Sequence, residues 1–183
     1  MSLIKATLLA LTAATIFTFV YAAKLPNAQV PEQYVVQPNC LGCLCEASTN
    51  CNVTQGCHVP YAGAYFCGPF LISWAYWSDA GKPVITNDNP DRKGAFENCV
   101  NDLYCAAQTV RNYMANFSDI TDCNGDGVLD CVDFAYIHNN GGFNCKDRSI
   151  ITTSFYKNFD TCWNVVRAAT APIAASGVLP PSA

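Results

Sequence analysis

The stretch CLGCLCEASTNCNVTQGCHVPYAGAYFC, residues 40–67, holds six of the twelve cysteines of this 183-residue chain. Cysteine of this density is typical of a small domain stabilised by disulfides in an oxidising compartment. A zinc cluster or a redox motif at residues 40–45 is less favoured, because no second cysteine knuckle follows and no βαβ pattern surrounds them. We therefore expect loops and short strands between Cys40 and Cys67, pinned by disulfides, and no long helix.

The composition limits the class of protein. The chain is 51% hydrophobic and 13% charged, which suits one folded domain with a real core. A formal net charge of −4 argues against nucleic-acid binding, which needs a basic surface.

The first 22 residues have the pattern of a secretory signal peptide. Lys5 precedes an apolar run over residues 6–20, and small residues before Ala22 offer a cleavage site. A retained membrane anchor is the alternative, but the run is short for a span. Without Lys5, nine basic residues remain against 14 acidic ones, a mature charge of −5. We expect a secreted, extracellular monomer with no membrane span in the mature chain.

The mature chain is expected to contain three parts. Residues 23–39 are proline-containing and lack cysteine, which favours an extended leader. Residues 40–167 form the folded domain, and the Ala/Pro-rich residues 168–183 form a flexible tail.

Hydrophobic periodicity predicts three helices. One begins at Pro69 and stops at Gly81, a second covers residues 95–117, and a shorter one covers residues 132–138. The predicted fold class is α+β: a mostly helical, disulfide-rich single domain.

Residues 122–133, DCNGDGVLDCVD, have the spacing of an EF-hand calcium loop. The predicted ligands are Asp122, Asn124, Asp126, the Val128 carbonyl, Asp130 and Asp133. Position 12 is Asp133 where these loops usually have glutamate. The alternative is an Asx-rich turn in which Asp130 caps the following helix. We expect any bound calcium to be structural, and no cofactor for catalysis.

Two sequons, at Asn52 and Asn116, are candidate glycosylation sites in a secreted chain.

Four blocks in order carry a family resemblance: CLGCLC (40–45), CGPFLISWAYWSDAGKP (67–83), CVNDLYCAAQTVRNYM (99–114) and DCVDFAYIHNNGG (130–142). Together they resemble the invertebrate-type (i-type) lysozymes, which include the destabilases. The resemblance implies a lysozyme-like α+β fold. It also implies the family's hydrolysis of the β-1,4 bond between N-acetylmuramic acid and N-acetylglucosamine in bacterial peptidoglycan.

The resemblance also implies the disulfides. Two cysteines of the family correspond here to Ala80 and Thr109, which leaves an even number. The implied pairs are Cys45–Cys51, Cys57–Cys67, Cys99–Cys105, Cys40–Cys131, Cys43–Cys162 and Cys123–Cys145.

The family's two catalytic carboxylates have no counterpart at the matching positions. The acid position corresponds to Ser48, and the second carboxylate to Pro60 or Tyr61. Residues 47–78 contain no Asp or Glu, although a glycosidase needs two carboxyl groups beside the scissile bond. Glu46 is the nearest substitute, but two residues along a helix would turn it about 200° away.

The family's other activity is that of an isopeptidase, and only one of its two candidate catalytic residues has a counterpart in this sequence. Its candidate serine corresponds to Ala64, whereas its histidine corresponds to His138. A histidine base without a nucleophile beside it cannot carry out nucleophilic catalysis, so the sequence does not favour isopeptidase activity.

Aromatic residues near the second block remain as candidate glycan-binding residues. Tyr65, Trp74 and Tyr76 could stack on sugar rings, or they could belong to the core, where we place Trp77. The sequence thus favours a secreted protein that binds peptidoglycan or related glycans with muramidase activity lost or weak. The alternative is an active antibacterial or digestive muramidase that uses Glu46.

Overall fold

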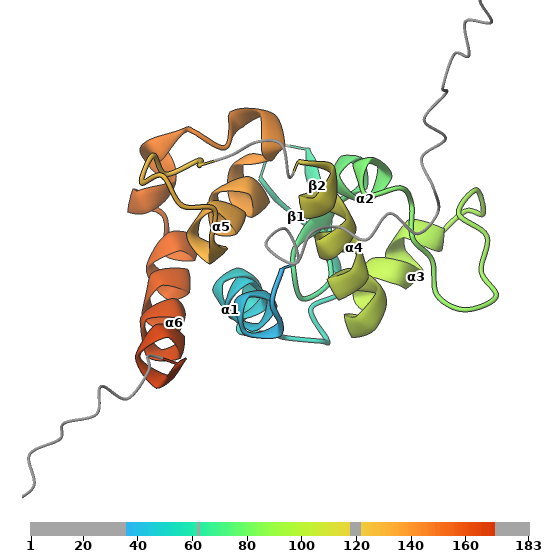
Figure 1. Cartoon of the computed structure of the whole chain (residues 1–183). Helices are drawn as coiled ribbons and strands as arrows, with labels where there is room; N and C mark the ends of the chain where they lie inside the picture. Colours follow the sequence, from blue (N-terminus) through green and yellow to red (C-terminus); the bar gives the residue numbers. More distant parts are fainter. Residues whose placement is uncertain (1–35, 62, 118–121, 171–183) are drawn as a thin grey trace, which may run out of the picture.

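The computed structural model describes residues 36–61, 63–117 and 122–170 (Figure 1). The signal peptide, residues 1–22, lies outside this range, as do most of the leader and the tail after Thr170. The helices are α1 (Pro38–Thr49), α2 (Trp74–Asp79), α3 (Ala95–Asn101), α4 (Leu103–Asn116), α5 (Cys131–Asn140) and α6 (Ser154–Thr170). The strands are β1 (Cys57–Tyr61), β2 (Ala64–Cys67) and β3 (Ile72–Ser73), and two 3-10 turns are η2 (Gly142–Asn144) and η3 (Arg148–Thr152).

Helix α1 corrects the first prediction, because the cysteine-rich segment begins with a 12-residue helix. Pro38 occupies its first turn, where a proline sacrifices no helical hydrogen bond. Cys40, Leu41, Cys43 and Leu44 are buried along it, so the cysteines themselves belong to the apolar stripe. The folded domain also begins before residue 40, since Val36 is 1% exposed and belongs to the core.

The three strands form one antiparallel sheet in the order β1-β2-β3. His58 pairs with Phe66, and Phe66 pairs in turn with Ser73. The expected short strands between Cys57 and Cys67 are therefore present.

Helix α2 begins five residues later than the sequence predicted. Residues 72–73 extend the sheet as β3, and the Ser73 hydroxyl then caps α2 by accepting the Tyr76 N–H at 3.2 Å. A hydroxyl acceptor at Ser73 is a stronger start signal than the proline at residue 69.

The helix predicted over residues 95–117 is broken into α3 and α4. Asp102 leaves the helical conformation, and its carboxylate accepts the Cys105 N–H at 2.8 Å as the cap of α4. The Cys99–Cys105 disulfide spans this break. A periodic apolar stripe continues across both helices, which is why the pattern alone does not show the break.

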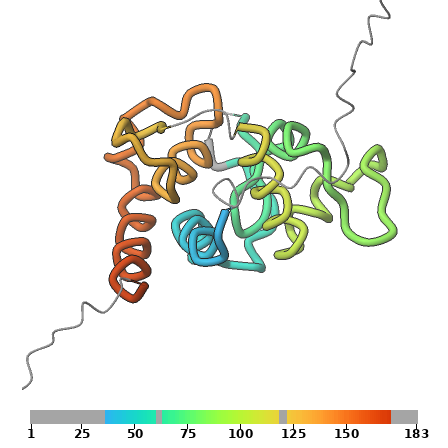
Figure 2. Tube along the Cα trace, in the orientation of Figure 1, coloured from blue at the N-terminus to red at the C-terminus, as the bar shows by residue number. Residues whose placement is uncertain are grey.

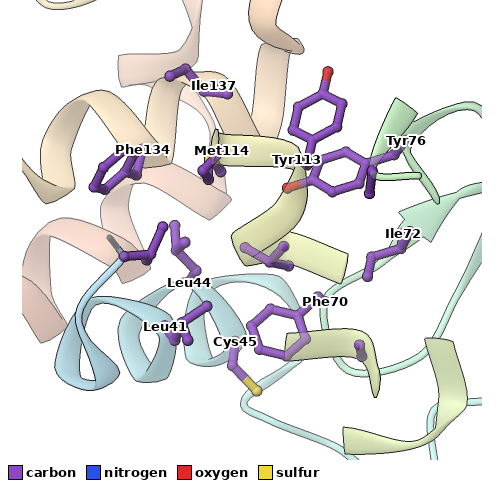
Figure 3. Packing of buried hydrophobic residues seen from close by; sticks show 14 of the residues in the cluster. Leu41, Leu44, Cys45, Phe70, Ile72, Tyr76, Tyr113, Met114, Phe134 and Ile137 are labelled. Carbon is purple, nitrogen blue, oxygen red and sulfur yellow. The ribbon is translucent and has the colours of Figure 1, made fainter. Parts of the chain in front are cut away.

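The core is gathered around α1. Leu41 and Leu44 of α1 point toward Met114 of α4 and toward Phe134 and Ile137 of α5 (Figure 3). Ala80 and Thr109, the two positions where the family has cysteines, are both buried in this core.

Six disulfides connect these elements, and they are the six pairs that the resemblance implied. Cys40–Cys131 and Cys43–Cys162 join α1 to α5 and α6, and Cys123–Cys145 ties the loop before α5 to the end of η2. Cys45–Cys51, Cys57–Cys67 and Cys99–Cys105 are local. All twelve cysteines fall in the described range, and no free one is found there.

Helix α6 was not predicted, although it is the longest at 17 residues. It lies beside α1, so the first and last helices of the described chain are neighbours (Figure 2). It continues to Thr170, past the predicted domain end at residue 167.

Across the described residues, no helix combines the length and apolarity that crossing a bilayer requires.

Candidate functional site

A pocket of about 450 Å³ lies where the end of α1, the sheet and the end of α5 meet. Residues from five parts of the chain line it: Ala47, Ser48, His58, Phe66, Phe70, Leu71, His138, Asn139, Thr153, Ser154 and Phe155. Ser48, which the resemblance matched to the family's acid position, and His138 thus come together although 90 residues separate them. We call this the Ser48 pocket.

Ser48 lies in the last turn of α1. Its hydroxyl donates to the Leu44 carbonyl at 2.8 Å, so its proton is directed into the helix. The same oxygen lies 3.4 Å from His138 Nε2.

The hydrogen bonds of His138 fix the state of its imidazole. Nε2 lies 3.0 Å from the Phe70 carbonyl, which can only accept, so Nε2 carries the hydrogen. Nδ1 lies 3.2 Å from the Tyr76 hydroxyl and therefore accepts from it. The ring also stacks on Phe155, with centroids 5.8 Å apart.

Burial lowers the pKa of His138 to about 4, although the hydrogen bond to the Phe70 carbonyl acts in the opposite direction. The ring is therefore neutral at physiological pH, and its Nε2–H cannot remove the Ser48 proton. The Ser48–His138 contact is a structural hydrogen-bond network and not a nucleophile–base pair.

Among the residues that the structure describes, those that line the Ser48 pocket include neither Asp nor Glu. Glu46 is exposed and lines a different pocket, of about 350 Å³, with residues 158–166 of α6. The helix thus turns Glu46 away from Ser48, as its spacing predicted. The side chains of Pro60 and Tyr61 lie outside what the structure describes.

The three predicted glycan-binding aromatics separate in the structure. Tyr65 and Trp74 are exposed at 40% and 55%, so each can present a ring to a ligand. Tyr76 is buried, stacked on Tyr113 with centroids 3.6 Å apart, and burial raises the pKa of its hydroxyl. Tyr76 therefore belongs to the core and presents no free face, contrary to its prediction as a glycan-binding residue. Trp77 is buried, as predicted.

His58 is a site residue that the sequence analysis missed. It and His138 are the only histidines of the chain, and both line the Ser48 pocket. Its Nδ1 is buried without a hydrogen-bond partner among the described residues. The sequence did offer a signal: His58 lies two residues before Pro60, one of the positions that the resemblance matched to the second carboxylate.

The loop at residues 122–133 is closed by its own acidic side chains. Asp122 accepts the N–H groups of Asp126 and Gly127, at 2.8 and 2.9 Å. Asp126 Oδ1 accepts the Val128 N–H, and its Oδ2 accepts from the Asn124 amide. Asp130 caps α5 by accepting the Val132 N–H at 2.7 Å, as the alternative interpretation predicted.

Asp133 is fully buried at the end of this loop. Its two oxygens accept the N–H groups of Cys123, Asn124 and Asp130. Burial nevertheless outweighs these bonds and raises the pKa of its carboxyl.

Within the described residues, no three His, Cys, Asp or Glu side chains are grouped as a metal site requires. Calcium binding by this loop stays a prediction.

Both sequon asparagines are exposed. Asn52 Oδ1 accepts from the Thr54 hydroxyl at 2.7 Å, and Asn116 Nδ2 donates to the Asp79 carbonyl at 2.6 Å. Ser118 of the second sequon lies outside the described residues, and glycosylation stays a prediction.

A mostly helical domain with a small antiparallel sheet, six disulfides and a pocket between helix and sheet defines a lysozyme-like α+β protein. The family model described as Destabilase matches residues 37–162. The chain belongs to this family, the destabilases or invertebrate-type lysozymes.

Relatives and solved structures agree with this assignment. The chain is 32% identical over 138 residues to "Lysozyme" of Magallana gigas, which covers 75% of this chain and 81% of the relative. It is 30% identical over 124 residues to "Invertebrate-type lysozyme 2" of Caenorhabditis elegans, covering 68% and 84%.

Two crystal structures share the fold. The Tapes japonica lysozyme aligns with a TM-score of 0.51 and 26% identity, over 78% of this chain and 95% of that one. The Meretrix lusoria lysozyme, solved in complex with Aeromonas hydrophila PliI, aligns with a TM-score of 0.52 and 30% identity, over 74% and 92%.

Proposed function

We propose that this chain is a secreted family member that binds bacterial peptidoglycan or a related glycan and hydrolyses it weakly or not at all. The observation that carries the proposal is the Ser48 pocket, where no carboxylate is found among the described residues that line it. Glycoside hydrolysis by this family's chemistry requires a carboxylic acid at the leaving oxygen and a second carboxylate across the sugar ring. A serine hydroxyl is far too weak an acid for the first role.

Binding does not need those carboxylates. Phe66, Phe70 and Phe155 provide apolar surface in the Ser48 pocket, and Ser154, Asn139 and His58 provide hydrogen-bonding groups. Apolar walls with a few convergent polar groups are typical of ligand pockets.

The alternative, an active muramidase that uses Glu46, requires this carboxylate beside the bound sugar. Glu46 lines the pocket between α1 and α6 instead. Because Glu46 lines this other pocket and not the Ser48 pocket, the alternative is disfavoured.

The test is a turbidity assay on bacterial cell walls beside a peptidoglycan pull-down, both with the mature protein. We expect binding without lysis above buffer. A Ser48→Glu, Tyr61→Asp double variant should gain some lysis if the rest of the pocket is intact. Lysis by the wild type that disappears in Glu46→Gln would overturn the proposal and establish the alternative.

A further inference from the structure

A second pocket, of about 410 Å³, lies beside α2 and α3 and shares no lining residue with the Ser48 pocket. Trp74, Trp77, Lys82, Phe96, Glu97 and residues 90–94 line it. We call it the Trp74 pocket.

The two pockets lie on opposite sides of the sheet. Phe66 of β2 lines the Ser48 pocket, whereas the adjacent Tyr65 packs on Phe96 of the Trp74 pocket, with centroids 6.3 Å apart. Successive side chains of a strand point to opposite faces. Figure 1 shows the same separation, with the strands between α3 on one side and α5 and α6 on the other.

Trp74 is the most exposed aromatic side chain of this pocket. It is 55% exposed, and no hydrogen bond of its indole N–H is found among the described residues. Trp77 and Phe96 are buried beneath the pocket and contact each other, with ring centroids 5.8 Å apart. A large aromatic ring held at the surface over a packed base suits stacking on a flat ligand face.

The lining of the pocket carries charges of both signs: Lys82, Arg92 and Lys93 are basic, and Asp91 and Glu97 are acidic. Lys82 Nζ lies 5.9 Å from the Trp74 ring centre and 3.8 Å from the Asp91 carboxylate. Lys93 and Glu97 add one charge of each sign. A strongly anionic or cationic ligand would meet a like charge, whereas the hydroxyl and amide groups of an uncharged sugar find both donors and acceptors.

The rim loop is already ordered. Arg92 donates two hydrogen bonds of 2.6 Å to Asp88, and this ion pair holds the pKa of the Asp88 carboxyl well below its usual range. Arg92 also donates to the Lys93 carbonyl at 2.7 Å. Ordering before binding lowers the entropy cost that a ligand must offset.

We propose that the Trp74 pocket is a second carbohydrate-binding site. It takes one uncharged sugar of a β-1,4-linked N-acetylhexosamine chain, stacked on Trp74 and hydrogen-bonded by Lys82 and Asp91. The choice of glycan rests on the proposed function, and the site extends it, because a polymer held at two separate sites dissociates more slowly than one held at a single site.

The experiment compares three variants of the mature protein with the wild type. Trp74→Ala removes the stacking ring, His58→Ala alters the Ser48 pocket, and Tyr104→Ala removes an aromatic side chain that is 85% exposed but lines neither pocket. The probes are insoluble peptidoglycan in a pull-down and a soluble N-acetylglucosamine hexamer in a fluorescence titration. We expect Trp74→Ala to weaken peptidoglycan binding about tenfold and Tyr104→Ala to leave it unchanged.

A second measurement does not depend on the stability of the alanine variant. The hexamer should protect the tryptophan fluorescence of the wild type from iodide quenching, and Trp74→Phe should abolish that protection. If Trp74→Ala binds as the wild type and the hexamer gives no protection, the inference is overturned. If His58→Ala has no effect while Trp74→Ala does, the Ser48 pocket is refuted as a binding site and the inference stands. A wild type that binds neither probe overturns both proposals.

Discussion

At the scale of single residues, His138 shows how packing decides what a side chain can do. By sequence it matches a catalytic histidine of the family. In the structure its two nitrogens are committed to the Phe70 carbonyl and the Tyr76 hydroxyl, and Phe155 stacks on its ring. Because the ring is held neutral and its Nε2 is protonated, it supports the pocket wall and does not act as a base.

His138 should also make the stability of the fold depend on pH. Its pKa is about 4 in the fold and near 6.5 in the unfolded chain, so between these values the unfolded chain binds more protons. The stability that depends on the neutral ring is therefore complete above pH 6.5 and lost as the pH falls toward 4. We expect urea unfolding to show a loss of roughly 1–3 kcal/mol over this window.

The control for this prediction is His138→Gln, whose amide can still donate to the Phe70 carbonyl but does not titrate. The variant should be less stable at pH 7 and should lose clearly less stability than the wild type between pH 6.5 and 4. Equal losses in both proteins would show that His138 does not cause the pH dependence.

At the scale of elements, acidic caps decide where helices begin. Asp102 starts α4, and Asp130 with Asp133 forms a capping box at the start of α5. The Asp133 carboxylate also accepts hydrogen bonds from the N–H groups of Cys123 and Asn124. It therefore holds the preceding loop against the start of α5.

Asp133→Ala should therefore destabilise the protein by about 2–4 kcal/mol, because it leaves three backbone N–H groups without their acceptor at a buried position. Asp91→Ala is the matched control, since the Asp91 side chain is 83% exposed, and it should cost less than about 0.5 kcal/mol. Urea denaturation measures both. Similar midpoints for the two variants would contradict the role assigned to Asp133.

The calcium prediction belongs to the same loop and has its own test. The spacing of oxygen donors over residues 122–133 predicts that millimolar calcium raises the melting temperature and that chelator reverses the effect. Asp126→Ala should abolish the response, and Asp160→Ala, on α6, should keep it. A melting temperature that calcium does not change would show that the loop is a capped turn only.

At the scale of the whole molecule, α1 is the element to which α5 and α6 are joined by disulfides. Its cysteines reach α5 and α6 through disulfides that close 91 and 119 residues of chain. Long closures restrict the unfolded chain more than short ones, so these two disulfides should contribute more stability than the local pairs.

Replacing Cys43 and Cys162 together by alanine should cost about 2–3 kcal/mol more than replacing Cys99 and Cys105, which are six residues apart. The paired replacements avoid leaving a free thiol in either variant. Calorimetric melting of the two double variants gives the comparison. An equal cost would indicate that native packing, and not chain entropy, decides what each disulfide contributes.

The sequence by itself determined the family and the α+β class, because four motif blocks in a fixed order carry this information. The six cysteine pairs followed only from the resemblance to that family, and the cap at Asp130 was the alternative to a calcium loop. It did not show that α1 lies within the cysteine-rich segment or that α6 exists, since both helices gain their stability from packing on each other and on the core. Only the tertiary structure buried Tyr76, brought His58 and His138 into one pocket, and placed Glu46 beside α6. These are relations between side chains from distant segments, and the direction in which each side chain points is decided by packing rather than by its neighbours in sequence.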